Sequence, residues 1–142
     1  MTKRSVSVAI FDDAHRVLIV QRPPDDEDLP NAWGLPAASL RAGESWEDAV
    51  RRAGREKLGV DLEVARELRR GSIERKAYKL EMRLYEADIA LGKPAVPQSD
   101  DRVTQYQQWK WGTPTDLMPA AEQGSLCCRL FLSFSLDRRF DH

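Results

Sequence analysis

Charged side chains that could bind a metal ion or a phosphate group are concentrated between Glu44 and Lys57. Glu44 and Glu56 carry carboxylates, which supply the hard oxygen ligands that Mg2+ prefers. Arg52 and Lys57 carry positive charges, and a lysine meets a phosphate as a compact point charge. Asp48, Arg52 and Glu56 are also spaced by four residues, so that on a helix they could form a ladder of ion pairs. Two interpretations of Glu56 therefore stay open, a metal ligand or catalytic base and a structural ion-pair partner.

A helix must position these side chains, and the sequence predicts where it begins and ends. Ser45 can accept a hydrogen bond from a backbone N–H of the first turn, and Asp48 occupies the third helical position. Gly59 is typical of a left-handed helix end, whereas Gly54 in the interior costs about 1 kcal/mol relative to alanine. Apolar residues at spacings of three, four and seven predict a stripe that packs on a sheet: Trp46, Ala49, Val50 and Ala53.

The rest of the chain predicts strands and two further helices. Apolar or alternating patterns indicate strands at residues 5–11, 17–21, 62–68, 77–87 and 104–111. The regular alternation at residues 77–87 predicts a half-exposed strand. We expect the first two strands to form a hairpin or to be near neighbours, and residues 69–71 to form a turn. Thr113 followed by Pro114 indicates a helix start, and apolar residues at helical spacing predict a terminal amphipathic helix over residues 125–136.

Composition predicts a single globular domain spanning residues 1–142. Lys and Arg number 22 against 23 Asp and Glu, so that no global charge favours a nucleic acid polymer or a membrane surface as partner. No run of 18 apolar residues is present, which excludes an apolar segment long enough to span a membrane as a helix. The adjacent Cys127 and Cys128 predict two thiols on a helix, at least one of them buried, with a redox switch as the less favoured alternative. We therefore expect a cytoplasmic protein.

The stretch from Ala38 to Val60 resembles the Nudix box, Gly-x5-Glu-x7-Arg-Glu-U-x-Glu-Glu-x-Gly-U, in which U is a bulky aliphatic residue. Aligned without gaps, five of the nine defined positions match, namely Glu44, Arg52, Glu56, Gly59 and Val60. The four departures are Ala38, Ala53, Gly54 and Lys57. The approach from Val17 through Trp33-Gly34-Leu35-Pro36 and the exit from Trp109 to Leu117 also resemble Nudix proteins.

This resemblance implies an α+β fold, with a mixed, curved sheet between the box helix and a C-terminal helix. It implies a hydrolase that cleaves a pyrophosphate bond in a small nucleoside diphosphate-linked molecule with Mg2+ or Mn2+, and it suggests a homodimer. For catalysis it implies Glu56, Glu44 and Arg52. For the metal it implies Glu56, Glu44 and the backbone carbonyl near Ala37. For the substrate, Arg22, Lys57 and Trp33 are the candidates.

The departures at Ala53 and Lys57 remove two of the three acidic residues that lie on one face of the box helix. Three outcomes stay open. The metal could be held with an acid from elsewhere, such as Glu47, Asp100 or Asp101. Lys57 could itself meet the pyrophosphate as a point charge. Hydrolysis could instead be lost, leaving a module that binds a nucleotide-like ligand or a protein partner. For Arg22 and Lys57 the alternative is a solvated surface cation, and for Trp33 it is packing.

Overall fold

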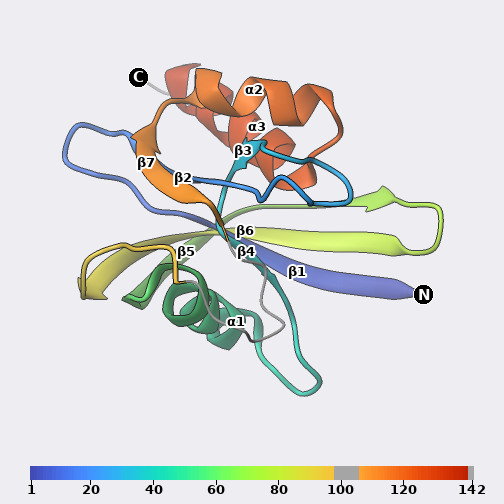
Figure 1. Ribbon diagram of the computed structural model, residues 1–142, viewed down its shortest axis with the longest axis horizontal. Helices are drawn as coiled ribbons and strands as arrows, with labels where there is room; N and C mark the ends of the chain where they lie inside the picture. Colours follow the sequence, from blue (N-terminus) through green and yellow to red (C-terminus); the bar gives the residue numbers. More distant parts are fainter. Residues whose placement is uncertain (98–105, 141–142) are drawn as a thin grey trace.

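The computed structural model describes residues 1–97 and 106–140, and it confirms the predicted α+β class (Figure 1). A four-stranded sheet has the order β4-β1-β6-β5, and a three-stranded sheet has the order β3-β2-β7. The strands are β1 (Thr2–Ala9), β2 (Val17–Gln21), β3 (Trp33–Gly34), β4 (Ala37–Ser39), β5 (Asp61–Glu74), β6 (Lys79–Leu91) and β7 (Gln108–Gly112). The helices are α1 (Trp46–Ala53), the π-helical turn η1 (Gly54–Leu58), α2 (Pro114–Glu122) and α3 (Leu126–Phe140). None of the described helices is long and apolar enough to cross a membrane.

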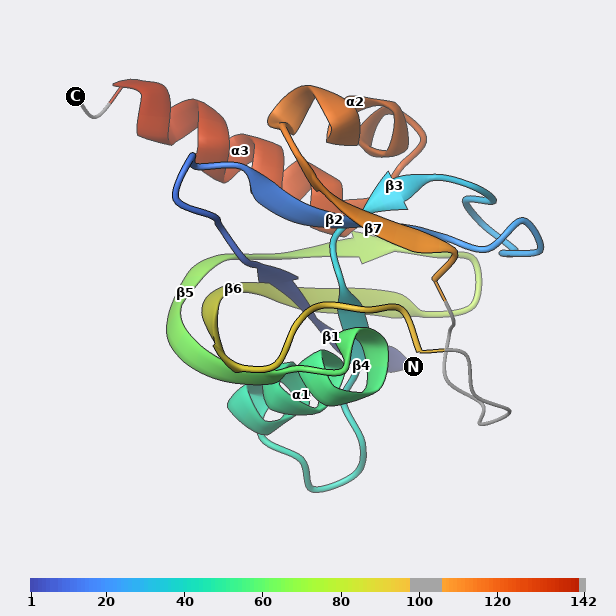
Figure 2. The same ribbon diagram turned by 60° about the vertical axis from the view of Figure 1, so that its left-hand side comes forward.

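The four-stranded sheet is mixed and lies between α1 and α3, as predicted. Helix α1 covers one face, while α2, α3 and the three-stranded sheet lie on the other side (Figures 1 and 2). Val6 and Val8 of β1 pack with Val50 of α1 in one core cluster. Leu84 of β6 packs with Phe131 of α3 in a second cluster on the opposite face. Both faces of the sheet are therefore buried.

This double burial corrects the prediction that residues 77–87 form a half-exposed strand. Leu84 and Tyr85 are consecutive in β6 and point to opposite faces, yet both are buried. Alternation along the strand does identify its two faces. It does not show that the second face is covered, because Tyr85 packs in the core cluster that α1 helps to form.

The first two predicted strands are near neighbours but belong to different sheets. Strand β1 pairs in parallel with β6 and antiparallel with β4, whereas β2 pairs with β3 and β7. The link between β1 and β2 is a single bridge between Phe11 and Val17, with Leu18 N–H donating to the Ile10 carbonyl at 2.8 Å. The chain thus changes sheets at the turn after Phe11, which a local pattern does not reveal.

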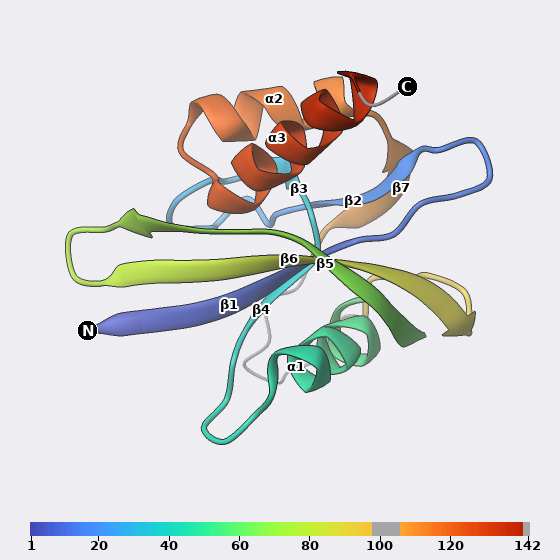
Figure 3. The same cartoon turned by 180° about the vertical axis from the view of Figure 1, so that it is seen from behind.

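The predicted turn at residues 69–71 is wrong, because β5 runs through these residues to Glu74. Register shifts between Val64 and Arg66 and between Glu67 and Arg69 let the long strand follow β6 (Figure 3). Gly71 lies in the strand where α3 approaches closely. A Cβ atom at this position would meet Leu130 Cδ2 at 3.0 Å. Gly71 therefore allows Leu130 of α3 to pack closely against the strand and does not mark a turn.

The predicted ends of the box helix are confirmed. Asp48 N–H donates to Ser45 Oγ at 3.1 Å at the start, and Gly59 is left-handed at the end with φ of 66°. The interior differs from a regular helix, because the α-helical hydrogen bonding gives way to the π-helical turn after Ala53. Thr113 and Asp116 likewise form the predicted cap of α2, with Thr113 N–H donating to Asp116 Oδ2 at 2.9 Å.

Candidate functional site

Arg52 joins the two carboxylates that the sequence singles out. Its guanidinium donates to both oxygens of Glu44 at 2.9 Å and to Glu56 Oε2 at 3.1 Å. A further bond reaches the Ser39 carbonyl of β4 at 2.6 Å, and the Arg52 side chain is 11% exposed. The predicted catalytic residues Glu44, Arg52 and Glu56 are thus brought together. The hydrogen bonds from Arg52 lower the pKa of Glu44 to about 2.

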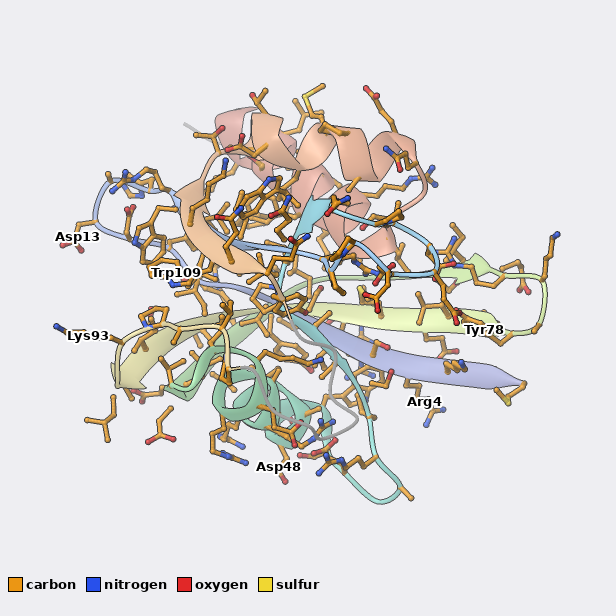
Figure 4. All side chains as sticks on the ribbon, viewed as in Figure 1. Arg4, Asp13, Asp48, Tyr78, Lys93 and Trp109 are labelled. Carbon is orange, nitrogen blue, oxygen red and sulfur yellow. The ribbon has the colours of Figure 1, made fainter. Side chains whose placement is uncertain are left out.

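Glu56 lies between two guanidinium groups. Arg41 donates to its second oxygen, Oε1, at 2.9 Å, and the Arg41 N–H also donates to Glu44 at 3.0 Å. The predicted ion ladder is half correct, because Arg52 pairs with Glu56 while Asp48 pairs with Arg51 at 2.9 Å. Asp48 lies on the side of α1 away from the sheet (Figure 4). Both Glu44 and Glu56 are therefore engaged by cations.

The described residues do not fit a metal site built on three carboxylates. Within residues 1–97 and 106–140, no group of three or more His, Cys, Asp and Glu side chains is placed to hold a metal ion. Ala53 is fully buried in a core cluster, and Lys57 replaces a carboxylate with a cation. Glu47 is exposed in the first turn of α1, and Asp100 and Asp101 lie outside the described residues. The formal charge at the three positions 53, 56 and 57 is consequently zero, because Lys57 offsets Glu56 and Ala53 is neutral.

Lys57 lines a cleft that lies between the four-stranded sheet and the start of α3. The cleft has a volume of about 260 Å3, and its walls come from β1, β4, β6, the end of β2 and the first turn of α3. Among the residues that the structure describes, four cations line it, Lys3, Arg22, Lys57 and Arg75, against a single carboxylate, Asp28. Ala37, the predicted carbonyl ligand of a metal, lines the same cleft.

Burial makes Lys57 unusual among the lysines of the chain. Lys57 is only 8% exposed. Burial of its ammonium group lowers the pKa of Lys57 to about 8. Glu56 raises the pKa, whereas the charges of Arg52 and Arg22 lower it. The ammonium group lies 5.5 Å from the ring centroid of Tyr106. The alternative of a solvated surface lysine is therefore wrong.

The other two predicted substrate contacts have different outcomes. Arg22 lines the cleft, and its guanidinium is held by Asp26 at 3.2 Å. Trp33 does not belong to the lining among the described residues. Its ring lies under the Lys110 ammonium at 4.5 Å and packs against the second core cluster. Packing is thus the better interpretation of Trp33.

Tyr106 is a site residue that the sequence did not identify as functional. It is 6% exposed, and burial raises its pKa to about 12, so that the phenol stays neutral at pH 7. Ala37 N–H donates to its Oη at 3.1 Å, which ties the box loop to the segment before β7. Alternation in the sequence sets Tyr106 apart from Trp109 and Trp111, but all three contribute to the first core cluster, so that this pattern does not mark Tyr106 as a site residue.

The far end of the cleft was also missed. Lys3 lies 4.2 Å from the ring centroid of Tyr78, and Arg75 donates to the Gly124 carbonyl at 3.1 Å. Tyr78 lies in the β5–β6 connection, immediately before the first residue of β6, as Figure 4 shows. These residues come from strand ends far from the box in sequence. Pairing of β1 with β6 is what brings them to the cleft.

Comparisons with known proteins agree on one family. The NUDIX domain model matches residues 1–126. The structure is similar to the MutT protein of Methanosarcina mazei Go1, with 16% identity, a TM-score of 0.72, and coverage of 99% of this chain and 96% of that chain. It is similar to the MutT NUDIX hydrolase of Burkholderia pseudomallei, with 27% identity, a TM-score of 0.69, and coverage of 88% and 99%.

A third similar structure is an ADP-ribose pyrophosphatase from Streptococcus suis 89-1591, with 20% identity, a TM-score of 0.64, and coverage of 96% of this chain and 92% of that chain. No curated protein matches the chain in sequence. The family model spans most of the chain and includes the whole segment from the cleft strand β1 to the start of α3. The chain therefore belongs to the NUDIX domain family, within the Nudix hydrolase superfamily.

Proposed function

We propose that this protein binds a small nucleoside diphosphate-linked molecule, with the phosphates held by the cations of the cleft. The observation that carries this proposal is the burial of the Lys57 ammonium in the cleft, at a position where the family box has an acid. Arg22 lines the same cleft, so that two cations can share a diphosphate. A charge pair about 4 Å apart is worth about 4 kcal/mol at an effective dielectric of about 20, before screening.

The chemical class of the ligand follows from the size and charge of the cleft. A volume of about 260 Å3 suits part of a small molecule, and an excess of cations suits an anion. Neighbours in structure include an ADP-ribose pyrophosphatase and a UDP-X diphosphatase, and the substrates in both names contain a diphosphate. We therefore favour a small molecule over a nucleic acid polymer, whose charge would need a larger basic surface.

Binding without a metal ion separates this proposal from metal-dependent recognition. We would titrate ADP-ribose and a panel of UDP-sugars into the protein by calorimetry, in EDTA and again in Mn2+. We expect at least one compound to bind in EDTA, and Lys57→Met to weaken this binding by about tenfold or more. Lys93→Met is the matched control, because Lys93 is exposed at the end of β6 away from Tyr78 (Figure 4). The proposal is wrong if the whole panel fails to bind, or if binding requires Mn2+ and is unaffected by Lys57→Met.

Slow hydrolysis of the pyrophosphate bond is the second candidate function. The observation that favours it is the retained arrangement of Glu44, Arg52 and Glu56, in which one arginine holds both carboxylates. The same panel would be incubated with Mg2+ or Mn2+ and the products separated by chromatography. Turnover that disappears in Glu56→Gln would establish a weakened Nudix hydrolase. Binding without turnover would instead establish a non-catalytic module.

A further inference from the structure

Cys127 places a thiol in the wall of the cationic cleft. It is the second residue of α3, it lines the cleft together with Arg22 and Lys57, and the packed protein leaves it 4% exposed. The neighbouring Cys128 is fully buried, and neither cysteine is in a disulfide. Both thiols are buried, but Cys127 borders the cleft, so that a molecule in the cleft would lie next to it.

The surroundings of Cys127 stabilise a thiolate. Cys128 Sγ lies 3.9 Å from Cys127 Sγ, and Ser125 Oγ lies 3.4 Å from it. The contact with Cys128 lowers the pKa of the Cys127 thiol, although burial raises it, and further lowering comes from Ser125, the Leu35 backbone N–H and the charge of Arg22. The first turn of a helix adds a partial positive charge.

The same contact assigns different roles to the two cysteines. Because of the Cys127 contact and of burial, the pKa of Cys128 is raised. Cys128 Sγ also approaches the Trp33 carbonyl at 3.9 Å, away from the box residues. Cys127 lines the cleft, whereas Cys128 is not among the described residues of its lining, so that Cys127 is the thiol that a molecule in the cleft can reach.

We propose that Cys127 is a covalent modification site for small anionic electrophiles that enter the cleft. The thiol proton is lost to solvent, the thiolate sulfur attacks an electrophilic carbon, and an S–C bond forms. The bond between that carbon and its leaving group breaks, and the leaving group departs with the electron pair. Lys57 and Arg22 attract the anionic part of the electrophile and hold it beside the sulfur.

This site goes beyond reversible binding of a diphosphate but shares its cleft. An adduct on Cys127 occupies space beside Arg22 and Lys57, so that modification and anion binding compete. Inorganic pyrophosphate should therefore protect Cys127. The adduct itself forms in the protein without any nucleotide, so that its detection does not depend on the proposed function.

Iodoacetate and iodoacetamide provide the test, because they have the same electrophilic carbon and differ in charge. Rates of alkylation at pH 7 would be measured by intact mass, and the adduct would be located by peptide mapping of the wild-type chain. N-acetylcysteine amide, a thiol with no other charged group, gives the intrinsic ratio of the two rates under the same conditions. We expect the ratio of iodoacetate to iodoacetamide at Cys127 to exceed that reference by about tenfold at low salt. High salt and Arg22→Met should each reduce this excess.

Two results would overturn the proposal. One is a rate ratio equal to that of N-acetylcysteine amide, which would show that the cations do not guide the reagent. The other is an adduct on Cys128, or no adduct before the protein unfolds in urea. Cys127→Ser and Cys128→Ser form a matched pair, with alkylation expected to be lost in the first and retained in the second. If a serine variant does not fold, the peptide map of the wild-type chain still decides the outcome.

Discussion

The side chain of Leu62 occupies the space that any side chain at position 54 would need. A Cβ atom added to Gly54 would lie 2.6 Å from Leu62 Cγ and 3.1 Å from the Val60 carbonyl oxygen. The family box has a bulky aliphatic residue at position 54, whereas here the apolar volume is supplied by a leucine on β5 that is 6% exposed. Leu62 of the sheet therefore fills the space that the family's aliphatic side chain at position 54 of the helix would occupy.

Gly54→Ala should destabilise the protein even though alanine favours a helix. Helix propensity alone predicts a gain of about 1 kcal/mol, whereas overpacking against Leu62 costs about 1–3 kcal/mol. We expect a net loss in the free energy of unfolding, measured by urea denaturation. Gly34→Ala is the control, because its Cβ would meet Cys128 Sγ at an ordinary 3.8 Å. An increase in stability for Gly54→Ala would contradict the packing argument.

Arg52→Met should be among the most destabilising substitutions on α1. It leaves the carboxylates of Glu44 and Glu56 without the arginine that joins them, at an expected cost of about 2–4 kcal/mol. Arg51→Met removes the neighbouring, half-exposed arginine and its pair with Asp48, which should cost less than about 1 kcal/mol. Urea denaturation of both variants gives the comparison. Equal losses would show that the Arg52 pairs contribute no more than a surface pair.

Lys57→Met should stabilise the protein at neutral pH. The pKa of Lys57 in the folded state is about 8, below its ordinary 10.5, so that the unfolded chain binds more protons between these values. Stability of the wild type therefore rises with pH across this window. Below pH 8 the substitution should gain about 1–3 kcal/mol, and the gain should shrink toward pH 10.5.

Chemical denaturation at a series of pH values would measure the Lys57 effect, with Lys93→Met as the exposed control. A stabilised variant that also binds diphosphates poorly would indicate that the buried charge is kept for ligand binding. A gain that is independent of pH would show that the difference comes from packing of the methionine.

Acid stability should depend on Glu44. The pKa of this carboxyl is held at about 2 in the folded state by hydrogen bonds from Arg52, against an ordinary 4.5. Its contribution to stability is complete above about pH 4.5 and is lost as the pH falls toward 2. Glu44→Gln should therefore flatten the acid limb of the stability profile between these values. Glu47→Gln, at an exposed position in the first turn of α1, should leave that limb unchanged.

Local signals in the sequence predicted the elements that are built locally. Ser45 and Gly59 delimit the box helix, and Thr113 begins α2, because a cap needs only a few neighbouring residues. The turn predicted at Gly71 failed for the opposite reason. Its glycine is required by Leu130 of α3, a contact between residues far apart in the chain.

The sequence predicted the charged residues of the candidate site but not the cleft in which Lys57 is buried. Glu44, Arg52 and Glu56 could be taken from the spacing of the box, and they do meet. Burial of Lys57 could not be read from the spacing, because it depends on Tyr106 and on strands that close the cleft. Asp100 and Asp101, named as helpers of a metal, lie outside the described residues and stay predictions.

The π-helical turn from Gly54 to Leu58 changes the angle between successive side chains around the axis of the box helix. Gly59 N–H reaches the carbonyls of both Arg55 and Gly54, so that this turn holds more residues than an α-helical turn. Glu56 and Lys57 therefore lie at a different angle from Ala53 about the helix axis than they would in a continuous α-helix. Glutamates introduced at positions 53 and 57 would lie on either side of the point where the α-helix gives way to the π-helical turn. A metal site designed on this helix would have to use ligand positions chosen for the π-helical spacing instead of the α-helical one.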